Sequence, residues 1–479
     1  MGVGKDTLHE KCAVVGVSAD ELSTDPAHLT YQALFALQHR GVEASGIATD
    51  GDGDKLHSLR KPGMVRDVFS DEDISSLPGR VAIGHNRYST NGGRNEHLQP
   101  VINPEINFAF AHNGNLPDPI ALERYLGTRR YRTGQYNDSE LFGNAIASKL
   151  HGGRTIEEAV REATEMAIGA YSCALSYDGV LAAFRDPNGI RPLELGVLDS
   201  GMIVASETCA LDTLGATHVR SINPGELLLM QDGKILQSSQ FAEPNPKLDM
   251  FELVYFARHD SYLYGERVNE VRRRFGYELA LAHPLNDHPN NTVVVPIPDT
   301  SVPAAEGYAE ALGIRSELAI IKNRYVGRTF MQPSQSLRLN SLSLKHTIVS
   351  ERIKGKHVIF VDDSIVRGNT LPRLVEMAYD AGALTVSVVI ASTPVRFSDF
   401  LGVDTPSQVE LMAANYTVEE MRREIGCKFL GFLSVSSMVR ATNHDASMFN
   451  LAPFTGEYPV SIGKHARNVY MPKSMEYVE

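Results

Sequence analysis

Short apolar runs alternate with helix-like segments after residue 248, and this alternation limits the fold more than any other feature of the chain. A strand, helix, strand succession predicts a parallel sheet with helices on its faces, and ligands of such sheets bind beyond the carboxyl ends of the strands. We therefore expect an α/β domain over residues 248–440 and a tail over residues 441–479. The segments of this pattern are Thr292–Pro296, Val302–Leu312, Glu317–Ile321, His357–Val361, Leu371–Ala381 and Leu384–Ala391.

The first half of the chain has a different pattern, in which short strands follow one another and helices are grouped apart. This arrangement predicts an α+β layered domain over residues 12–239. The polar segment 240–247, which holds two prolines, is typical of a linker. The expected strands are Cys12–Val17, Val81–Gly84, Phe108–Ala111, Tyr171–Tyr177, Leu193–Leu198 and Met202–Ala205, and the expected helices are Leu29–Gln38 and Ser139–Leu150.

Composition argues against several classes of protein. The 479 residues carry a formal net charge of -12, so the chain lacks the basic character of a nucleic-acid-binding protein. It contains no apolar run of about 18 residues that would span a membrane, and residues 1–11 lack the apolar core of a secretion signal. The four cysteines have no C-x-x-C spacing, which argues against disulfides or zinc. We expect a cytoplasmic protein with no nucleic-acid or membrane partner.

The segment Val358–Thr370 combines an apolar strand, two aspartates and a turn of small and hydroxyl residues that leads into a helix. Backbone N–H groups at a helix start bind phosphate well. Asp362 and Asp363 alone would more often form a solvated acidic turn, but Ser364, Gly368 and the final threonine at these offsets favour a phosphate site. The two carboxylates suit ribose hydroxyls and Mg²⁺.

Two further segments support this site. Val294–Ser301 is a second strand that ends in polar and hydroxyl residues, although the same residues would also serve as an ordinary helix N-cap. Lys322–Lys345 is basic, rich in hydroxyls and without hydrophobic periodicity. That composition fits a mobile lid over an anionic ligand better than an ordinary surface loop.

A cysteine and four polar segments mark the first half of the chain. Cys12 directly precedes an apolar run, where a cysteine is usually plain core packing. Four polar segments beside strands and helix starts, however, are difficult to explain as core. Removal of residues 1–11 by cleavage between Lys11 and Cys12 would leave a free α-amino group, with a pKa of about 8, to take the thiol proton. The four segments are Leu37–Gly41, Ile83–Thr90, Ala111–Leu116 and Asn137–Glu140.

The two halves together resemble one family. Val358–Thr370 is similar to the motif with which type I phosphoribosyltransferases bind phosphoribosyl pyrophosphate (PRPP), and the first half resembles N-terminal-nucleophile glutaminase domains. Over roughly residues 12–460 the chain resembles the glutamine PRPP amidotransferases. The resemblance implies a pentosyl-class glycosyltransferase that converts PRPP, glutamine and water to 5-phosphoribosylamine, glutamate and pyrophosphate, the first committed step of de novo purine synthesis. It also implies feedback inhibition by purine nucleotides and a homotetramer.

The resemblance implies a role for each matching residue of the glutaminase half. Cys12 would attack the glutamine amide. Arg87 would hold the α-carboxylate of glutamine and Asp138 its α-ammonium group. Asn113 and the Gly114 N–H would form the oxyanion hole.

In the second half the resemblance implies that Asp362 and Asp363 contact the ribose and Mg²⁺, with Thr300 as a further candidate at the metal site. A turn that begins at Ser364 would bind the 5-phosphate. The complete predicted PRPP-binding set is Asp362, Asp363, Ser364, Arg367, Gly368, Asn369 and Thr370, with Lys322 and Lys345 as additional phosphate contacts.

The chain departs from the family pattern in two respects. Some relatives with a short propeptide hold a structural iron–sulfur cluster through four cysteines. Beyond Cys12 only three cysteines remain here, and a cubane needs four thiolates, so we expect no iron–sulfur cluster. In addition, His259 stands where a proline is usual. The places that correspond to the cluster ligands are Asp249, Asp399, Asn450 and Pro453.

Three other classes of protein remain as alternatives. Other glutaminase-containing enzymes, such as glucosamine-phosphate or asparagine synthetases, share the first half but lack the motif at 358–370. A plain phosphoribosyltransferase lacks the first half. A non-catalytic sensor of PRPP or nucleotides would be expected to lose Cys12 or the acid pair, and this chain keeps both.

Overall fold

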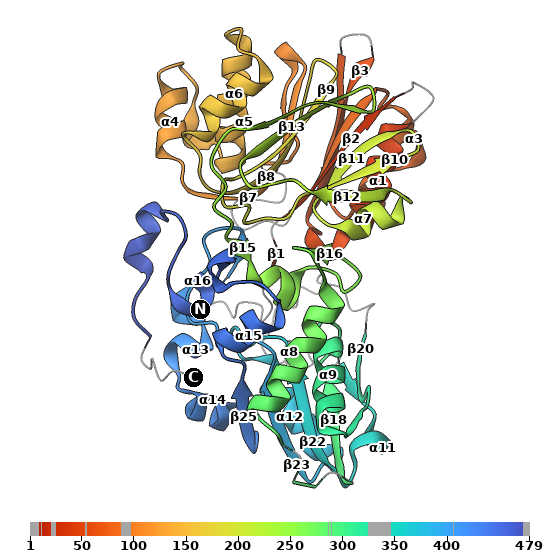
Figure 1. Cartoon of the computed structure of the whole chain (residues 1–479), viewed down its shortest axis with the longest axis vertical. Helices are drawn as coiled ribbons and strands as arrows, with labels where there is room; N and C mark the ends of the chain where they lie inside the picture. The colour runs from red at the N-terminus through yellow and green to blue at the C-terminus, as the bar shows by residue number, and fades with distance from the viewer. Residues whose placement is uncertain are drawn as a thin grey trace.

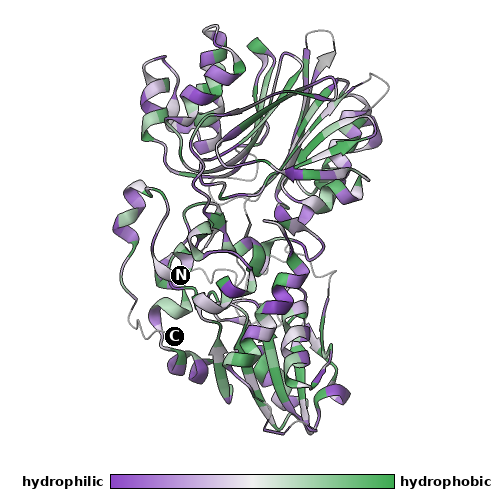
Figure 2. Ribbon diagram, in the orientation of Figure 1, coloured by the Kyte–Doolittle hydropathy of each residue, from purple (hydrophilic) through white to green (hydrophobic). Residues whose placement is uncertain are grey.

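The chain folds into two lobes, seen one above the other in Figure 1. The computed structural model describes residues 9–10, 12–20, 25–52, 55–87, 97–285, 287–288, 290–323, 346–405 and 407–472. Among these residues, no helix combines the length and the hydropathy needed to cross a bilayer. Apolar residues follow the strands of both lobes, whereas polar residues cover the outward faces of the helices (Figure 2).

The N-terminal lobe contains two antiparallel sheets that pack on each other through apolar side chains such as Val14, Ile83, Ala174 and Val204. In spatial order the seven-stranded sheet is β12 (Thr217–Ser221), β10 (Glu194–Leu198), β11 (Gly201–Ala205), β2 (Ala13–Ala19), β5 (Val81–Arg87), β3 (Ala44–Asp52) and β4 (Lys55–Pro62). The six-stranded sheet is β14 (Lys234–Gln240), β13 (Glu226–Gln231), β9 (Val180–Arg185), β8 (Ile168–Tyr177), β7 (Phe108–Asp118) and β6 (Val101–Asn103).

Helices cover the outer face of each sheet, which gives the α+β layered domain predicted from the sequence. Apolar faces of these helices join separate core clusters on the two sides of the sandwich. The helices over the first sheet are α1 (Pro26–Ala36), α2 (Val65–Val68), α3 (Asp71–Ser75) and α7 (Thr208–Thr213). Those over the second are α4 (Ile120–Gly127), α5 (Asp138–His151) and α6 (Ile156–Thr164), as Figure 1 shows.

The C-terminal lobe is built on a five-stranded parallel sheet with helices on both faces, as the alternating pattern predicts. Successive residues of the central strands enter two different core clusters, so these strands are buried on both sides. The strand order is β19 (Arg315–Ser316), β18 (Thr292–Pro296), β22 (His357–Asp362), β23 (Thr385–Ile390) and β25 (Phe429–Phe432). One face is covered by α8 (Val268–Ala282), α9 (Val302–Leu312) and α15 (Val435–Ala441), and the other by α12 (Thr370–Asp380) and α14 (Val418–Ile425).

One expected strand of this sheet was wrong. The prediction placed Glu317–Ile321 in the parallel sheet, but the edge strand of that sheet is the shorter β19, which ends at Ser316. Residues 320–322 form β20 (Ile320–Lys322), which pairs antiparallel with β21 (His346–Ile348) in a separate ribbon. A short apolar run does not reveal which neighbour it will pair with, because the choice depends on contacts distant in sequence.

Several short elements lie where the lobes meet, near the labels β1, β15 and β16 in Figure 1. The chain crosses from one lobe to the other through a π-helical turn, η4 (Glu252–Phe256), and its C-terminal part returns there. Phe454 stacks on Phe251 with ring centroids 5.2 Å apart. The short strand pairs are β15 (Leu248–Asp249) with β26 (Phe449–Asn450), β16 (Tyr262–Leu263) with β17 (Glu266–Arg267), and β1 (His9–Glu10) with β24 (Val403–Asp404). The remaining short helices are α11 (Ser350–Ile353), α13 (Met412–Asn415) and α16 (Ala452–Thr455).

Candidate active site

Cys12 directly precedes β2, in the N-terminal lobe. Strands β2 and β5 pair with Ala13 opposite Asn86. The next residues along the two chain segments are Cys12 and Arg87, which is the last residue of β5. Cys12 is only 8% exposed and has a φ of 76°. Few residues other than glycine adopt that backbone conformation, and such residues often mark functional sites.

Ser206, at the end of β11, connects the start of β2 with Asn113 of β7. The Val14 N–H donates to Ser206 Oγ at 2.9 Å, and Asn113 Nδ2 reaches the same oxygen at 3.5 Å. A hydrogen bond of 3.5 Å is weak, so the amide donor of Asn113 remains suited to a further acceptor. Asn113 Oδ1 is buried and has no hydrogen-bond partner in the part of the chain that the structure describes. The two sheets thereby bring the amide close to the strand that follows Cys12.

The position after Asn113 accepts only glycine. Gly114 has a φ of 151°, and a Cβ added there would lie 2.0 Å from the Ala170 carbonyl oxygen and 2.9 Å from His112 Nε2. A side chain would therefore force β7 away from β8, whereas glycine allows the close approach.

Asp138 is the first residue of α5 and is joined to β7. Its Oδ2 accepts a hydrogen bond from the Leu116 N–H at 3.1 Å. Asn137 and Glu140 form a reciprocal capping box that fixes this helix start, and His112 Nδ1 lies 2.9 Å from Ser139 Oγ. A carboxylate at a helix N-terminus is favoured by the helix dipole. The helix therefore presents Asp138 beside the strand that carries Asn113 and Gly114.

A buried ion-pair network begins beside Cys12 and crosses to the second lobe. Arg40 Nε donates to the Cys12 carbonyl at 3.4 Å, and its Nη1 and Nη2 bind Glu207 Oε1 at 2.6 Å and Glu252 Oε1 at 2.7 Å. Arg191 binds the same Glu252 oxygen at 2.8 Å. All four charged residues of this network, Arg40, Glu207, Glu252 and Arg191, are fully buried. Although burial opposes ionisation, His39 and Arg40 hold the pKa of Glu207 well below its usual range.

The second predicted site lies at the carboxyl edge of the parallel sheet. Strand β22 ends at Asp362, whose Oδ1 accepts from the Asp363 N–H at 3.0 Å, and Ser364 Oγ donates to Asp363 Oδ1 at 2.8 Å. Burial raises the pKa of Asp363 to about 6, against the opposing effects of Ser364, Arg272 and Lys322. A nearby cation or phosphate-bound metal would favour the ionised carboxylate.

The turn after the acid pair leads directly into α12. Asn369 is the N-cap of this eleven-residue helix, Thr370 is its first residue, and Gly368 has a φ of 77°. Arg367 Nη2 lies 3.4 Å from Glu410 Oε1. Residues Ser364 to Thr370 thus surround a helix N-terminus, as the sequence predicts for a phosphate site.

The loop after β18 lies beside this turn. Pro296 pairs with Val361 in the parallel register, and the Ile297 N–H donates to the Val361 carbonyl at 2.9 Å. Thr300 follows in this loop, and Lys322 Nζ lies 3.1 Å from Asp299 Oδ2. Lys345 and most of the predicted lid lie outside the described residues.

Three of the four places that the sequence resemblance matches to cluster cysteines, Asp249, Asp399 and Asn450, hold polar side chains. Asp249 is opposite Asn450 in the β15–β26 pair and binds Arg191 Nη1 at 2.6 Å. Asp399 Oδ1 accepts from the Leu401 and Val403 N–H groups at 2.7 and 3.1 Å. Burial raises the pKa of Asp249 to about 7, with Arg191 opposing the shift and Asp399 adding to it.

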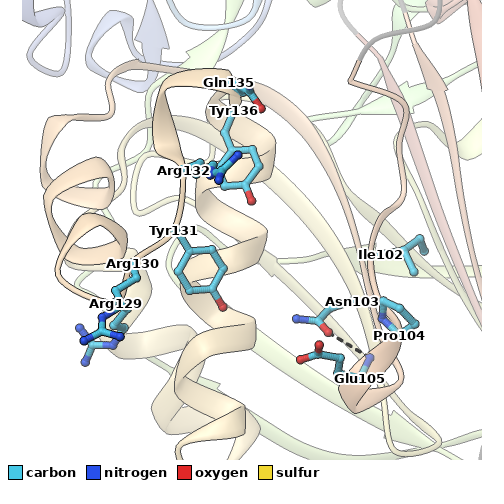
Figure 3. A pocket seen from close by; sticks show the side chains of 10 residues that line it. All are labelled: Ile102, Asn103, Pro104, Glu105, Arg129, Arg130, Tyr131, Arg132, Gln135 and Tyr136. Atoms are coloured by element: carbon cyan, nitrogen blue, oxygen red, sulfur yellow. Dashed lines mark hydrogen bonds between the residues drawn. The ribbon is translucent and has the colours of Figure 1, made fainter.

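A surface cavity of about 570 Å³ lies elsewhere on the first lobe (Figure 3). Asn103, Glu105, Tyr131 and Arg132 are among its lining residues, and none of the predicted catalytic residues lines it. It is therefore not the candidate active site.

Sequence reasoning missed two residues that organise the site. Arg40 lies within the polar segment Leu37–Gly41 and Ser206 directly follows the expected strand Met202–Ala205, but neither received a role. The available signal was the position of each residue in the chain. Ser206 directly follows an apolar strand, and Arg40 comes shortly after the helix α1.

Comparisons with known proteins agree with this two-site arrangement. Residues 85–213 match the model of a glutamine amidotransferase domain, and residues 278–394 match that of a phosphoribosyl transferase domain. The amidophosphoribosyltransferase of Bacillus subtilis (strain 168) is 39% identical, with 95% of each chain covered. That of Synechococcus elongatus is 40% identical over 95% of this chain and 93% of its own. The chain belongs to the amidophosphoribosyltransferase family.

Solved structures give the same result. The glutamine PRPP amidotransferase of B. subtilis, complexed with ADP and GMP, is 39% identical and superposes with a TM-score of 0.86 over 95% of this chain and 98% of its own. A structure described as the allosteric regulatory enzyme of purine biosynthesis is 38% identical, with a TM-score of 0.87 over 96% of this chain and 98% of its own. The activity of this amidophosphoribosyltransferase chain is that of its family: it forms 5-phosphoribosylamine, glutamate and pyrophosphate from PRPP, glutamine and water in purine biosynthesis.

Proposed function

We propose that Cys12 is the nucleophile that releases ammonia from glutamine. Its Sγ forms a bond to the amide carbon, ammonia leaves, and water then hydrolyses the thioester to glutamate. Arg87 holds the substrate α-carboxylate and Asp138 the α-ammonium group, while Asn113 and the Gly114 N–H stabilise the oxyanion. The observation that carries this proposal is the strand pairing of Ala13 with Asn86, the neighbours of Cys12 and Arg87, with Asn113 joined to the same strand through Ser206.

We infer that the thiol proton passes to the α-amino group of Cys12 once residues 1–11 have been removed. Lys11 precedes the cleavage point, and β1 of this segment pairs with β24 of the second lobe. A free amine of about pKa 8 is a suitable base at neutral pH. The intact mass of the active enzyme should therefore correspond to a chain that begins at Cys12, and full activity with the segment attached would contradict this.

The second lobe is proposed to bind PRPP at the carboxyl edge of its sheet. Residues Ser364, Arg367, Gly368, Asn369 and Thr370 bind the 5-phosphate at the start of α12, and Asp362 and Asp363 hold the ribose hydroxyls. Lys322 and Lys345 contact the diphosphate.

Mg²⁺ is proposed as the cofactor of this second site. It binds proteins through one or two carboxylates together with substrate oxygens. Asp362 and Asp363 can provide the carboxylates, and Thr300 can add its hydroxyl. Among the described residues no group of three or more His, Cys, Asp or Glu side chains is placed to hold a metal ion alone, so PRPP would complete the coordination. When bound, Mg²⁺ would neutralise the charge of the pyrophosphate leaving group.

We propose that no iron–sulfur cluster is present, since Asp249, Asp399 and Asn450 supply no thiolate at the corresponding places. The purified enzyme should show no visible absorbance from a cluster.

We further propose that the protein is a cytoplasmic homotetramer and that purine nucleotides inhibit it. Its proposed domains are a glutaminase domain over residues 12–239, a phosphoribosyltransferase domain over 248–440 and a tail over 441–479. The ADP and GMP of the B. subtilis relative support nucleotide binding. Light scattering and nucleotide inhibition assays test these points.

Replacement of the thiol tests the two-site proposal. Cys12→Ala should lower glutamine-dependent pyrophosphate release to background, because no nucleophile remains. The same variant should keep ammonia-dependent activity within about twofold of the wild type, because the PRPP site is unchanged. The two rates are compared in one preparation, and equal loss of both would contradict separate sites.

A further inference from the structure

A loop of the second lobe, residues 398–404, contacts the part of β7 that carries Asn113 and Gly114. The side-chain amide Nδ2 of Asn115 donates to the Phe400 carbonyl at 2.7 Å, between residues 285 positions apart in the chain. This hydrogen bond lies one residue beyond a proposed oxyanion donor, on the side of the first lobe that faces the second (Figure 1). The strand that carries the oxyanion donors is therefore held partly from outside its own lobe.

An apolar contact supports the same position. Leu401 of the loop is 1% exposed and belongs to a buried cluster with Ala170 and Ile190 of the first lobe. Ala170 is the partner of Asn115 in the β7–β8 pair, and its carbonyl oxygen is the atom that leaves no room for a side chain at Gly114. The loop thus packs on both strands at the point where β7 requires glycine.

The loop itself is fixed within the second lobe. Asp399 Oδ1 accepts from the Leu401 and Val403 N–H groups at 2.7 and 3.1 Å. The Tyr458 hydroxyl donates to the Ser398 carbonyl at 2.6 Å. These hydrogen bonds restrain the backbone on both sides of the carbonyl that binds β7. The loop can therefore serve as a fixed point against which the strand is placed.

We propose that Asn115 is a positioning residue for glutamine hydrolysis: its amide ties β7 to the Phe400 carbonyl, and this contact fixes the place of the oxyanion donors. The inference rests on the proposed roles of Asn113 and the Gly114 N–H. Such donors must lie at hydrogen-bond distance from an oxygen that becomes charged only in the transition state. A displacement of about 1 Å can cost about 100-fold in rate. A loop of the PRPP-binding lobe thereby contributes to the chemistry at Cys12.

The side chain at this position has to donate, because a backbone carbonyl only accepts. Asn115→Ala removes the donor. Asn115→Asp keeps the shape of the side chain but presents only acceptors when ionised, so it should lose at least as much activity. Asn188→Ala is the matched control. Asn188 Nδ2 also donates to a backbone carbonyl, that of Asn245 at 2.8 Å, and it belongs to neither proposed set of site residues.

Glutamate release and ammonia-dependent pyrophosphate release are measured on each full-length variant. For Asn115→Ala we expect the kcat for glutamine to fall about tenfold while its KM stays within about threefold, because the oxyanion forms only in the transition state. The ammonia-dependent kcat should stay within about twofold of the wild type, since the PRPP site is unchanged. Asn188→Ala should keep the wild-type ratio of the two rates.

Three results would overturn the positioning role of Asn115. They are a ratio of the two rates in Asn115→Ala within about twofold of the wild type, an equal loss of both rates, and a rise in the KM for glutamine alone. Thermal unfolding of the same samples shows which variants are folded, and Asn115→Asp provides the test if Asn115→Ala is not. Glutamine hydrolysis by Cys12→Ala, assayed beside them, would instead refute the proposed glutaminase site.

Discussion

His85 is a fully buried histidine on the strand that ends at Arg87. Its Nε2 lies 3.2 Å from the His112 carbonyl oxygen, and its Nδ1 has no hydrogen-bond partner among the described residues. Burial lowers the pKa of His85 to about 3, and the charge of Arg87 contributes to the shift. The folded state therefore holds a neutral imidazole, whereas the unfolded chain binds a proton below about pH 6.5.

This difference predicts that the lobe loses stability as the pH falls. The unfolded state binds more protons than the folded state between about pH 6.5 and pH 3, so the contribution is complete above that window and is lost below it. At pH 5 the loss should be about 2 kcal/mol. His85→Gln keeps an N–H donor and cannot titrate, so its urea midpoint should fall less between pH 7 and pH 5. The exposed His151→Gln variant is the control, and parallel pH profiles for all three proteins would contradict the assignment.

Single residues were predictable where their chemistry is unusual for their position. Cys12, the paired aspartates at the end of β22 and the hydroxyl turn after them could be chosen from the sequence because each stands in a distinctive local context of neighbouring polar residues. Ser206 and Arg40 could not, because their importance comes from contacts alone. The Ser206 hydroxyl meets the Val14 N–H across 192 residues, and Arg40 meets Glu252 across 212.

At the scale of elements, strand β7 carries a prediction. Gly114→Ala would bring a Cβ to 2.0 Å from the Ala170 carbonyl oxygen and require a φ of 151°, which costs about 1–3 kcal/mol in backbone strain alone. The Gly114 N–H is also a proposed oxyanion donor, and loss of one such donor lowers rates by about 10²–10³. Glutamine hydrolysis should therefore fall at least about a hundredfold, while ammonia-dependent activity is kept.

A matched control is available on the helix that follows β7. A Cβ added at Gly127, in α4, would meet nothing within 4 Å, so Gly127→Ala should stabilise the helix slightly and leave both activities unchanged. Glutamine hydrolysis assayed beside thermal unfolding distinguishes the two alanines. Wild-type hydrolysis by Gly114→Ala would show that β7 can move without harm to the site.

Elements of the parallel sheet were predicted better than their pairing. Thr292–Pro296 and Val302–Leu312 have the predicted bounds, because apolar runs and helical periodicity are local signals. Strand β25, which completes the sheet, was not predicted at all. Its Phe-Leu-Gly-Phe run is four residues long and contains a glycine, so only its place beside β23 makes it a strand.

At the scale of the whole molecule, the two lobes are joined by buried charges rather than by apolar surface alone. Arg40 from the first lobe and Arg191 share Glu252, and Glu207 accepts a hydrogen bond from Ser261, which follows η4. Nothing in the sequence predicted this network, because its members lie in segments far apart and each would be an ordinary surface charge on its own. Through Arg40 the network joins the Cys12 carbonyl to η4, where the chain crosses to the second lobe.

Removal of the Arg40 charge should weaken this connection. Arg40→Met keeps much of the side-chain volume but leaves Glu207 and Glu252 as buried carboxylates without a shared cation, which should cost about 3–5 kcal/mol. Arg40→Lys keeps the charge but not the planar fork, so its loss of stability should be smaller. Because Arg40 also contacts the Cys12 carbonyl, glutamine-dependent activity should fall further than ammonia-dependent activity in both variants.

Unfolding midpoints and the ratio of the two activities measure these effects together. Arg66→Met is the control, since Arg66 pairs with Asp67 at 3.4 Å on the exposed surface, where an ion pair contributes little. A network that couples the lobes requires the ratio of glutamine-dependent to ammonia-dependent rates to decrease in the order wild type, Arg40→Lys, Arg40→Met. If both rates fell in proportion to the folded fraction, the buried charges would only stabilise the junction and would carry no signal between the sites.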